Sequence, residues 1–175
     1  MAVEKKFFEG NKKTYIHLTG TSGFTHIIRP DDFQGKVEYK IEVSMTEEDL
    51  SELQDIYNEL WGPMVESFRA ESPKNAKMKL KETPTLTGLR EADDGTVYIK
   101  AKTRFRPSVT VGDKLYKDPR DSSNPDLDAL RFIRNGETVT VMCEPIFYPG
   151  LGSGISLRAV NVKVDNLEAT GAVAK

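Results

Sequence analysis

The feature that most constrains this chain is a regular alternation of side-chain type over residues 96–107. Odd positions in this stretch are mostly apolar. The even positions carry no acid, and they are Tyr98, Lys100, Lys102, Arg104 and Arg106. Because successive side chains of a β-strand point to opposite faces, the pattern predicts a strand with one face in the core. Its other face presents a row of cations headed by a tyrosine.

This pairing of cations with a ring suits single-stranded nucleic acid, whose phosphates need positive charge and whose unstacked bases need a flat surface. An alternative needs no ligand, since lysine and arginine also keep the exposed face of an amphipathic strand soluble. The strand alone does not decide between the two interpretations.

Charge is segregated along the chain although its total is nearly balanced, with 25 cations and 27 acids in 175 residues. Residues 46–61 hold six acids and no cation, whereas residues 69–106 hold ten cations and five acids. A near-neutral total argues against a protein that coats duplex DNA with a basic body, but a locally basic surface can still attract an anionic polymer. The length fits one domain, which we expect to span residues 1–175 with a frayed tail at about 166–175.

The single cysteine, Cys143, lies in an apolar run and is predicted to be a small core residue. One cysteine excludes an internal disulfide framework and fits a reducing compartment. The sequence shows no signal peptide and no apolar run of membrane-spanning length. We therefore expect a soluble intracellular protein without membrane contacts.

The first half of the chain predicts strands followed by a helix. Residues 12–18 and 24–29 look strand-like, with a turn or loop at 29–32, and residues 35–45 give the clearest alternation. Thr46 and the acids after it predict a helix N-terminus. Gly62-Pro63 should end or kink that helix, with a short second helix over 63–70 and a basic loop over 72–81.

The second half predicts further strands separated by turns. Asp94-Gly95 and Asn135-Gly136 mark hairpin turns. Residues 137–147 and 155–164 read as strands, the second with a bulge near Ala159 where its apolar phase slips. Residues 107–131 show the least pattern and suggest a mobile loop.

This order of elements predicts a mainly β protein. About five strands with a helical insertion after an early strand fit the OB fold, a five-stranded Greek-key barrel. A β-sandwich is the structural alternative.

The residues give little support for catalysis or a cofactor. His17, His26 and one cysteine are too few for a zinc site, and the pairs Asp31-Asp32 and Asp93-Asp94 are typical turn residues. A metal-dependent nuclease built on such acids stays open as a minor alternative. Gly150, Gly152 and Gly154 precede a strand, so they do not form a phosphate-binding loop that opens a helix.

Phe147 and Tyr148 are adjacent on one predicted strand and must point to opposite faces. Phe147 is in phase with Val141 and Cys143, so we expect Tyr148 to be the exposed ring. Stacking on such a ring contributes about 1–3 kcal/mol per base and tolerates any sequence. Trp61, on the acidic helix, is expected to serve packing instead.

Five segments together resemble the single-stranded-DNA-binding proteins of T-seven-like bacteriophages. The likeness begins with a Gly-Thr segment, an aromatic residue and a basic-Pro-Asp turn within residues 18–31. It continues through residues 35–43, 94–102, 139–148 and 154–162 in the same order. The family's long acidic C-terminal tail has no counterpart in residues 166–175.

The resemblance implies an OB-fold protein that is not an enzyme, needs no cofactor, and binds single-stranded DNA in phage replication, recombination and repair. It also implies contacts with phage DNA polymerase and helicase-primase, a possible homodimer, and a location in the host cytoplasm. An RNA-binding module of the same fold is the alternative, because a fold does not fix its ligand. The predicted binding residues are Arg29, Lys77, Lys79, Lys81, Tyr98, Lys100, Lys102, Arg104, Phe147 and Tyr148.

Overall fold

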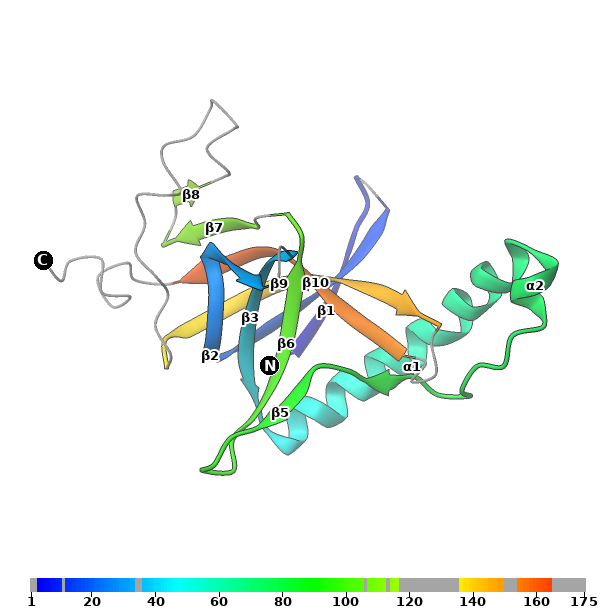
Figure 1. The fold of residues 1–175 in the computed structure, drawn as a ribbon, viewed down its shortest axis with the longest axis horizontal. Helices are drawn as coiled ribbons and strands as arrows, with labels where there is room; N and C mark the ends of the chain where they lie inside the picture. The colour runs from blue at the N-terminus through cyan, green and yellow to red at the C-terminus, as the bar shows by residue number, and fades with distance from the viewer. Residues whose placement is uncertain are drawn as a thin grey trace, which may run out of the picture.

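The computed structural model describes residues 3–10, 12–33, 36–105, 107–112, 114–116, 136–149 and 154–164. Its helices are α1 (Glu47–Ala70) and α2 (Pro73–Ala76) (Figure 1). Its strands are β1 (Val3–Phe8), β2 (Lys13–Phe33), β3 (Lys36–Met45), β4 (Thr85–Leu86), β5 (Leu89–Glu91), β6 (Val97–Thr103), β7 (Ser108–Val111), β8 (Lys114–Tyr116), β9 (Thr138–Tyr148) and β10 (Gly154–Val164).

The described strands form one continuous sheet that closes into a ring. The ring runs β6-β3-β2-β9-β10 and returns to β6 through a short parallel pairing, in which Ala101 lies opposite Leu157 and Lys102 opposite Arg158. With the helix inserted after β3, this arrangement confirms the predicted OB-fold class. The β-sandwich alternative is wrong, because its two stacked sheets would not be joined edge to edge.

Apolar residues at alternate positions of the ring strands fill its interior. The strand alternation is confirmed for β3, β6 and β9, whose inward positions are fully buried at Ile41, Val43, Ile99, Ala101, Val139, Val141 and Cys143. Burial raises the pKa of the Cys143 thiol, as expected for a core cysteine. In β10 the register shifts between Ala159 and Asn161, which confirms the predicted bulge.

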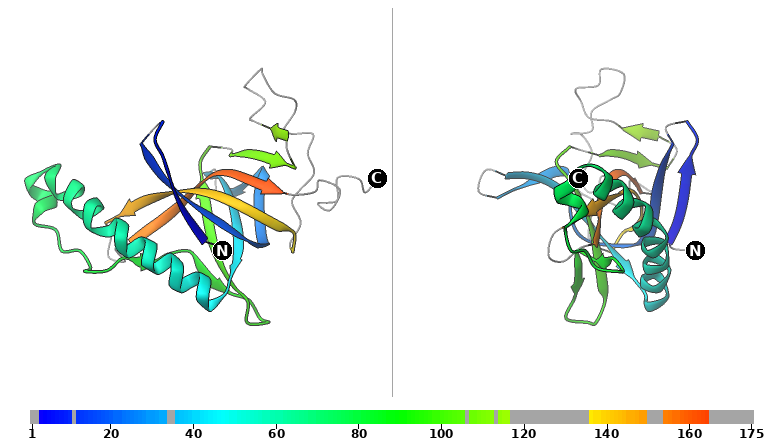
Figure 2. Two further views of the ribbon diagram at one scale, coloured as in Figure 1. Left: turned by 180° about the vertical axis from the view of Figure 1, so that it is seen from behind. Right: turned by 90° about the vertical axis from the view of Figure 1, so that its right-hand side faces the viewer.

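Helix α1 lies along the outside of the ring and extends beyond it, with α2 at its far end (Figure 2). Its start is as predicted: the Thr46 side chain accepts from the Asp49 N–H, and the Asp49 carboxylate accepts from the Thr46 N–H. Leu53, Tyr57 and Trp61 are buried against the sheet at helical spacing. Trp61 has the expected packing role, and its indole N–H donates to the Lys81 carbonyl at 2.9 Å.

The helix does not end at Gly62-Pro63, as one of the two predicted outcomes required, because α1 continues to Ala70 with Pro63 inside it. Proline removes the N–H that would bond the Glu59 carbonyl. Both Glu59 and Pro63 are exposed, so water can satisfy that carbonyl. The predicted loop over 72–81 also contains a short helix, α2, capped by the Ser72 side chain.

The two strands predicted before residue 30 are one strand, β2, which runs through the predicted turn at 29–32 to Phe33. Its pairing with β3 shifts register between Ser22 and Thr25 and again between His26 and Asp31. Such irregularities let one strand accommodate a proline, which cannot donate to the ladder. Gly23 and Pro30 therefore lie at irregularities within one strand and do not mark a break between two.

The region that shows least pattern in the sequence contains two short strands, β7 and β8, and β7 pairs with the end of β10. Most of the predicted mobile loop, residues 117–131, lies outside the described residues, as do residues 150–153 and the tail after residue 164. Among the helices of the described residues, none is long and apolar enough to cross a membrane.

Candidate nucleic-acid interface

The outward faces of β3 and β6 form the surface that the sequence marks as cationic. Antiparallel pairing sets Lys102 opposite Lys40, Lys100 opposite Glu42, and Tyr98 opposite Ser44. Residues directly opposite each other share a face of the sheet, so the β6 cations lie beside a β3 row of mixed charge. Lys102 is about half exposed and lies 4.0 Å from Glu38, whereas Lys100 is half-buried.

A compact cluster around Arg90 occupies one end of this face. Arg90, on β5, donates from Nε to Glu42 Oε2 at 2.9 Å and from Nη2 to Glu42 Oε1 at 2.8 Å. Its guanidinium carbon lies 4.4 Å from the ring centre of Phe24 and 4.9 Å from that of Tyr98. The cation is therefore stacked against two rings while both bonded nitrogens are held by one carboxylate, an arrangement suited to its planar fork.

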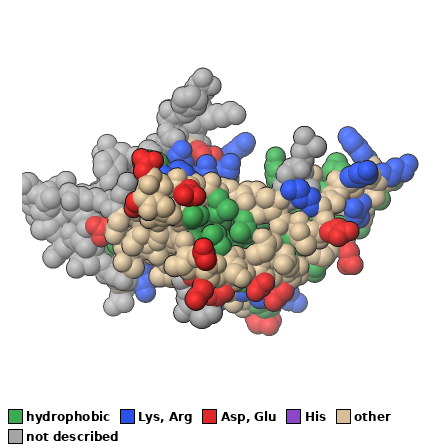
Figure 3. All heavy atoms as spheres, turned by 90° about the horizontal axis from the view of Figure 1, so that it is seen from below, with side chains coloured by type: hydrophobic (Ala, Val, Ile, Leu, Met, Phe, Trp, Pro, Cys, Tyr) green, Lys and Arg blue, Asp and Glu red, His purple; other side chains and the backbone are tan. Residues whose placement is uncertain are grey.

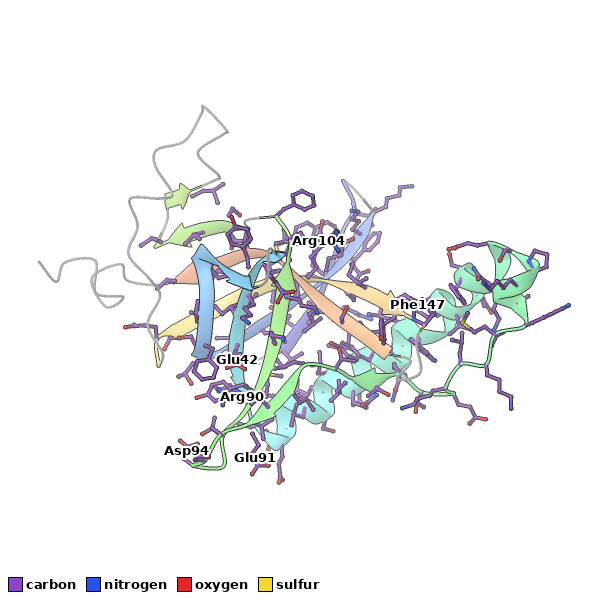
Figure 4. All side chains as sticks on the ribbon, viewed as in Figure 1. Glu42, Arg90, Glu91, Asp94, Arg104 and Phe147 are labelled. Atoms are coloured by element: carbon purple, nitrogen blue, oxygen red, sulfur yellow. The ribbon has the colours of Figure 1, made fainter. Side chains whose placement is uncertain are left out.

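Glu42 is the centre of the cluster and is only 6% exposed, although its alternation places it on the polar face. Burial alone would raise the pKa of this carboxyl. Hydrogen bonds from Arg90 and from the Phe24 N–H (2.9 Å), with the positive charges of Arg90 and Lys100, outweigh burial and lower the pKa. The carboxylate is thus held in its charged form beside Arg90 (Figure 4).

Gly23 makes room for this cluster. A Cβ at this position would lie 2.7 Å from Glu42 Oε1 and 2.9 Å from Tyr98 Cδ1, closer than van der Waals contact permits. Glycine here lets β2 pass close to the carboxylate and the tyrosine ring, and the next residue, Phe24, contacts Arg90.

The two rings that contact Arg90 differ in exposure. Phe24 is 54% exposed, whereas Tyr98, the predicted stacking residue, is half-buried with Arg90 over its ring. Phe24, Arg90 and Glu42 are not among the binding residues predicted from the sequence. Alternation within a strand reports which side a residue faces, and no local signal showed that β5 would bring Arg90 across to β2 and β3.

Arg104 and Phe105, both exposed, follow directly after the opposite end of β6. Arg104 lies at the upper end of β6 in Figure 4, and Arg90 and Glu42 lie at the lower end. Phe105 was expected on the core face, but it is 74% exposed because β6 ends at Thr103 and the alternation stops there. The cationic row Lys100, Lys102 and Arg104 therefore runs between two exposed rings, Phe24 and Phe105.

The aromatic pair on β9 divides as predicted. Phe147 packs against α1, with its ring centre 5.0 Å from that of Trp61 and 5.0 Å from that of Phe68, and Tyr148 is 49% exposed. Phe147 therefore joins the helix to the sheet, while Tyr148 has a ring open to solvent. Tyr98 lies on β6 and Tyr148 on β9. These two strands are separated by β10, which pairs with β9 on one edge and with β4 and β6 on the other.

The predicted basic loop lies by α2 and not on the β3–β6 face. Seen from below, cations gather at the end of the molecule that carries α2, and acids lie along the first half of α1 (Figure 3). Lys77, Lys79 and Lys81 are all exposed. Only Lys81 is tied towards the ring, since its ammonium donates to Thr85 Oγ1 at 2.8 Å and Thr85 pairs with Gly154 of β10.

Two further hypotheses from the sequence concern a DNA contact by Arg29 and a metal site built on the paired aspartates. The backbone of Arg29 lies in β2, but its side chain is outside the described part, as are those of Asp31 and Asp32. Asp94 Oδ1 accepts from the Thr96 N–H at 3.0 Å, which is the turn role of an aspartate. Within the described ranges, no group of three metal-ligating side chains lies together.

No protein-family model and no curated protein matches the sequence. Solved structures do match. The single-stranded DNA-binding protein of bacteriophage Enc34, solved in complex with single-stranded DNA, superposes with a TM-score of 0.56 at 17% identity, covering 87% of this chain and 86% of that one. The fold is shared with phage single-stranded DNA-binding proteins.

A second match is gp2.5, a single-stranded DNA-binding protein encoded by bacteriophage T7. It superposes with a TM-score of 0.50 at 16% identity, and the match covers 86% of this chain and 91% of that one. The family resemblance seen in the sequence is thereby confirmed at the level of the fold. At this level of sequence identity the comparison shows that the fold is shared, and it does not show which residues bind DNA.

Proposed function

We propose that this chain is a non-enzymatic protein that binds single-stranded DNA without sequence preference. The observation that carries the proposal is the stack of Phe24, Arg90 and Tyr98 at one end of the face that carries Lys100 and Lys102. The exposed Arg104 follows the other end of β6. This face is formed by the second and third strands of the ring, the surface that OB folds use for oligonucleotides. The rings supply stacking and the cations supply phosphate contacts.

In this proposal the residues of the face have different roles. Arg90 is neutralised by Glu42 and holds the rings in place, so Phe24 offers a base its outer face. Lys100, Lys102 and Arg104 contact phosphates as the strand passes along β6. Arg29, Lys81 and Tyr148 are proposed to extend these contacts, and Lys77 and Lys79 to add long-range attraction from the α2 end. Two phage proteins of this fold that bind single-stranded DNA support the assignment.

The biological part of the proposal follows the family resemblance. It includes a role in phage DNA replication, recombination and repair in the host cytoplasm, contacts with phage DNA polymerase and helicase-primase, and a homodimer. Co-sedimentation with each enzyme and sedimentation equilibrium of the protein alone would test these points separately from DNA binding.

The first test is a salt titration of affinity for a labelled oligonucleotide. Affinity for single-stranded DNA should fall with a log-log slope of about −0.7 for each phosphate contacted. Duplex DNA and RNA of matched sequence serve as competitors. A salt-independent affinity, or a preference for duplex, contradicts the proposal, and stronger competition by RNA would favour an RNA-binding module.

The second test removes the outer ring of the stack. Phe24→Ala should weaken binding by about 1–3 kcal/mol, or about 5- to 150-fold, to a similar degree for every sequence, because stacking tolerates all bases. Phe7→Ala is a matched control, since Phe7 on β1 is also 54% exposed but lies outside the β3–β6 face. Equal affinities of the two variants would remove Phe24 from the site.

A further inference from the structure

A groove of about 790 Å³ opens beside the seam where β6 meets β10. Its apolar surface includes Phe105 and Ile146, and its charged lining comprises Lys102, Arg104, Arg158 and Glu38. The volume is within the range of about 300–1,000 Å³ typical of small-molecule sites. Ile146 and Arg158 lie outside the β3–β6 face, and Phe105 lies just beyond its end, since β6 ends at Thr103.

The groove exists because the two strands pair over only two residues each. β6 pairs with β10 at Ala101–Leu157 and Lys102–Arg158, and β6 ends one residue later at Thr103. Thr103 Oγ1 accepts the Phe105 N–H at 3.1 Å, which fixes this departure. The Phe105 ring is consequently exposed at the groove and not in the ring interior.

The charges in the groove favour an anion. Arg158 and Lys102 lie in register on adjacent strands, and neighbouring like charges destabilise a sheet unless they are compensated. Each has an acid nearby: Lys102 lies 4.0 Å from Glu38, and Arg158 is hydrogen-bonded to Glu144. Arg104 makes no ion pair with any residue that the structure describes, so the lining keeps more positive than negative charge.

The groove also lies between two predicted binding residues on different strands, Lys102 on β6 and Tyr148 on β9. Lys102 lies at one side of it on β6, and Ile146 lies at the other on β9. Tyr148 follows Ile146 by two residues on the same face of β9, about 7 Å further along the strand. A polymer that leaves β6 through the groove would therefore reach the exposed ring of Tyr148.

We propose that this groove is a second subsite for single-stranded DNA, which holds one nucleobase against Phe105 and Ile146 with its flanking phosphates on Arg104 and Arg158. The strand then continues from β6 across β10 towards Tyr148 on β9. This inference rests on the proposed function and specifies the path of the strand beyond the β3–β6 face. Exposed rings bordered by cations suit a nucleic acid better than an apolar protein surface.

The experiment compares a short and a long oligonucleotide, since OB folds occupy about 4–16 nucleotides. Phe105→Ala should weaken binding of an oligonucleotide of about 16 nucleotides by about 5- to 150-fold, and should leave binding of one of about 4 nucleotides, which fills only the β3–β6 face, unchanged. Arg158→Gln should lower the salt slope for the long oligonucleotide by about 0.7, the share of one phosphate. The matched controls are Phe7→Ala and Lys163→Gln, the latter an exposed lysine on β10 outside the groove.

The outcomes separate the subsite from the proposed function. If the wild-type chain binds no single-stranded DNA, the proposed function itself fails. If the wild type binds and Phe24→Ala weakens it, but Phe105→Ala and Arg158→Gln bind the long oligonucleotide like their controls, the subsite alone is overturned. Because Phe105 is 74% exposed, its replacement should leave the unfolding midpoint unchanged, and urea unfolding of each variant checks this.

Discussion

At the scale of single residues, the site depends on a charge that the sequence pattern places in water and the structure buries. Glu42 occupies an outward position of β3, but Arg90 from β5 and the backbone of Phe24 from β2 cover it. A buried carboxylate is tolerated only when it is paired and hydrogen-bonded. Removing Arg90 would leave that charge uncompensated, so the stack and local stability depend on the same ion pair.

This pairing predicts a pH dependence of stability. The folded pKa of Glu42 is below its usual value, so its stabilising contribution is fully present above the unfolded pKa of about 4.3 and is lost as pH falls through the folded pKa. The stability difference between wild type and Glu42→Gln should therefore shrink from about pH 6 to about pH 3. Urea midpoints across this range measure it.

The matched control for this prediction is Glu66→Gln, which alters an exposed glutamate on α1. Its difference from wild type should be small at every pH, as for most surface substitutions. A Glu42→Gln difference that stays constant from neutral to acidic pH would show that the ionised carboxylate does not supply the stabilisation.

At the scale of elements, α1 shows how packing can override a local helix-breaking signal. Gly62-Pro63 is a strong local stop, but Trp61 is buried before it and Phe68 packs on Phe147 after it. Contacts on both sides hold the helix in register across the proline. The cost of the lost hydrogen bond remains in the folded state.

Pro63→Ala should therefore stabilise the protein by about 1–3 kcal/mol, because it restores a donor for the Glu59 carbonyl and removes the ring clash. Loss of the proline's restriction on the unfolded chain offsets about 0.4–1 kcal/mol of this gain. Urea unfolding measures the change. Gly62→Ala, at a neighbouring exposed position with nothing within 4 Å of the added Cβ, should add only about 0.5–1 kcal/mol. A destabilised Pro63→Ala variant would contradict this account of the helix.

At the scale of the whole molecule, a short segment that follows the helix adds to the closure of the ring made by β6 and β10. β4 pairs with the start of β10, and β5 pairs with β6. The chain thus runs from the start of β10 to the start of β6, at the opposite end of their pairing from Phe105. It places Arg90 beside the β3–β6 face. Two hydrogen bonds attach this segment to the helix. The Trp61 indole N–H of α1 donates to the Lys81 carbonyl, and the Lys81 ammonium donates to the Thr85 hydroxyl of β4.

Gly154→Ala tests this closure. An added Cβ would lie 2.4 Å from the Thr85 carbonyl oxygen and 3.0 Å from its nitrogen, so β4 would have to move away from β10. We expect a loss of about 1–3 kcal/mol in unfolding free energy, the range of an overpacked site. Gly10→Ala is the control, because no atom lies within 4 Å of its added Cβ. Equal midpoints for the two variants would show that β4 yields without cost.

Much of the fold could be predicted from local patterns. Period-two alternation located β3, β6, β9 and β10, and Thr46 with the acids after it located the start of α1. These signals are local because side-chain direction in a strand and capping at a helix end depend on a few neighbouring residues. The same locality explains the errors at residues 29–32 and at Pro63, where distant contacts outweigh a local breaker.

The sequence by itself determined which side chains each strand directs outward, and so the cationic row of β6 and the division between Phe147 and Tyr148. Only the tertiary structure decided which of these side chains meet. The Phe24–Arg90–Tyr98 stack joins three strands, and the groove at Phe105 depends on where β6 and β10 stop pairing. The physical reason is that pattern fixes direction along one strand, whereas contact between strands depends on register and on the closure of the ring.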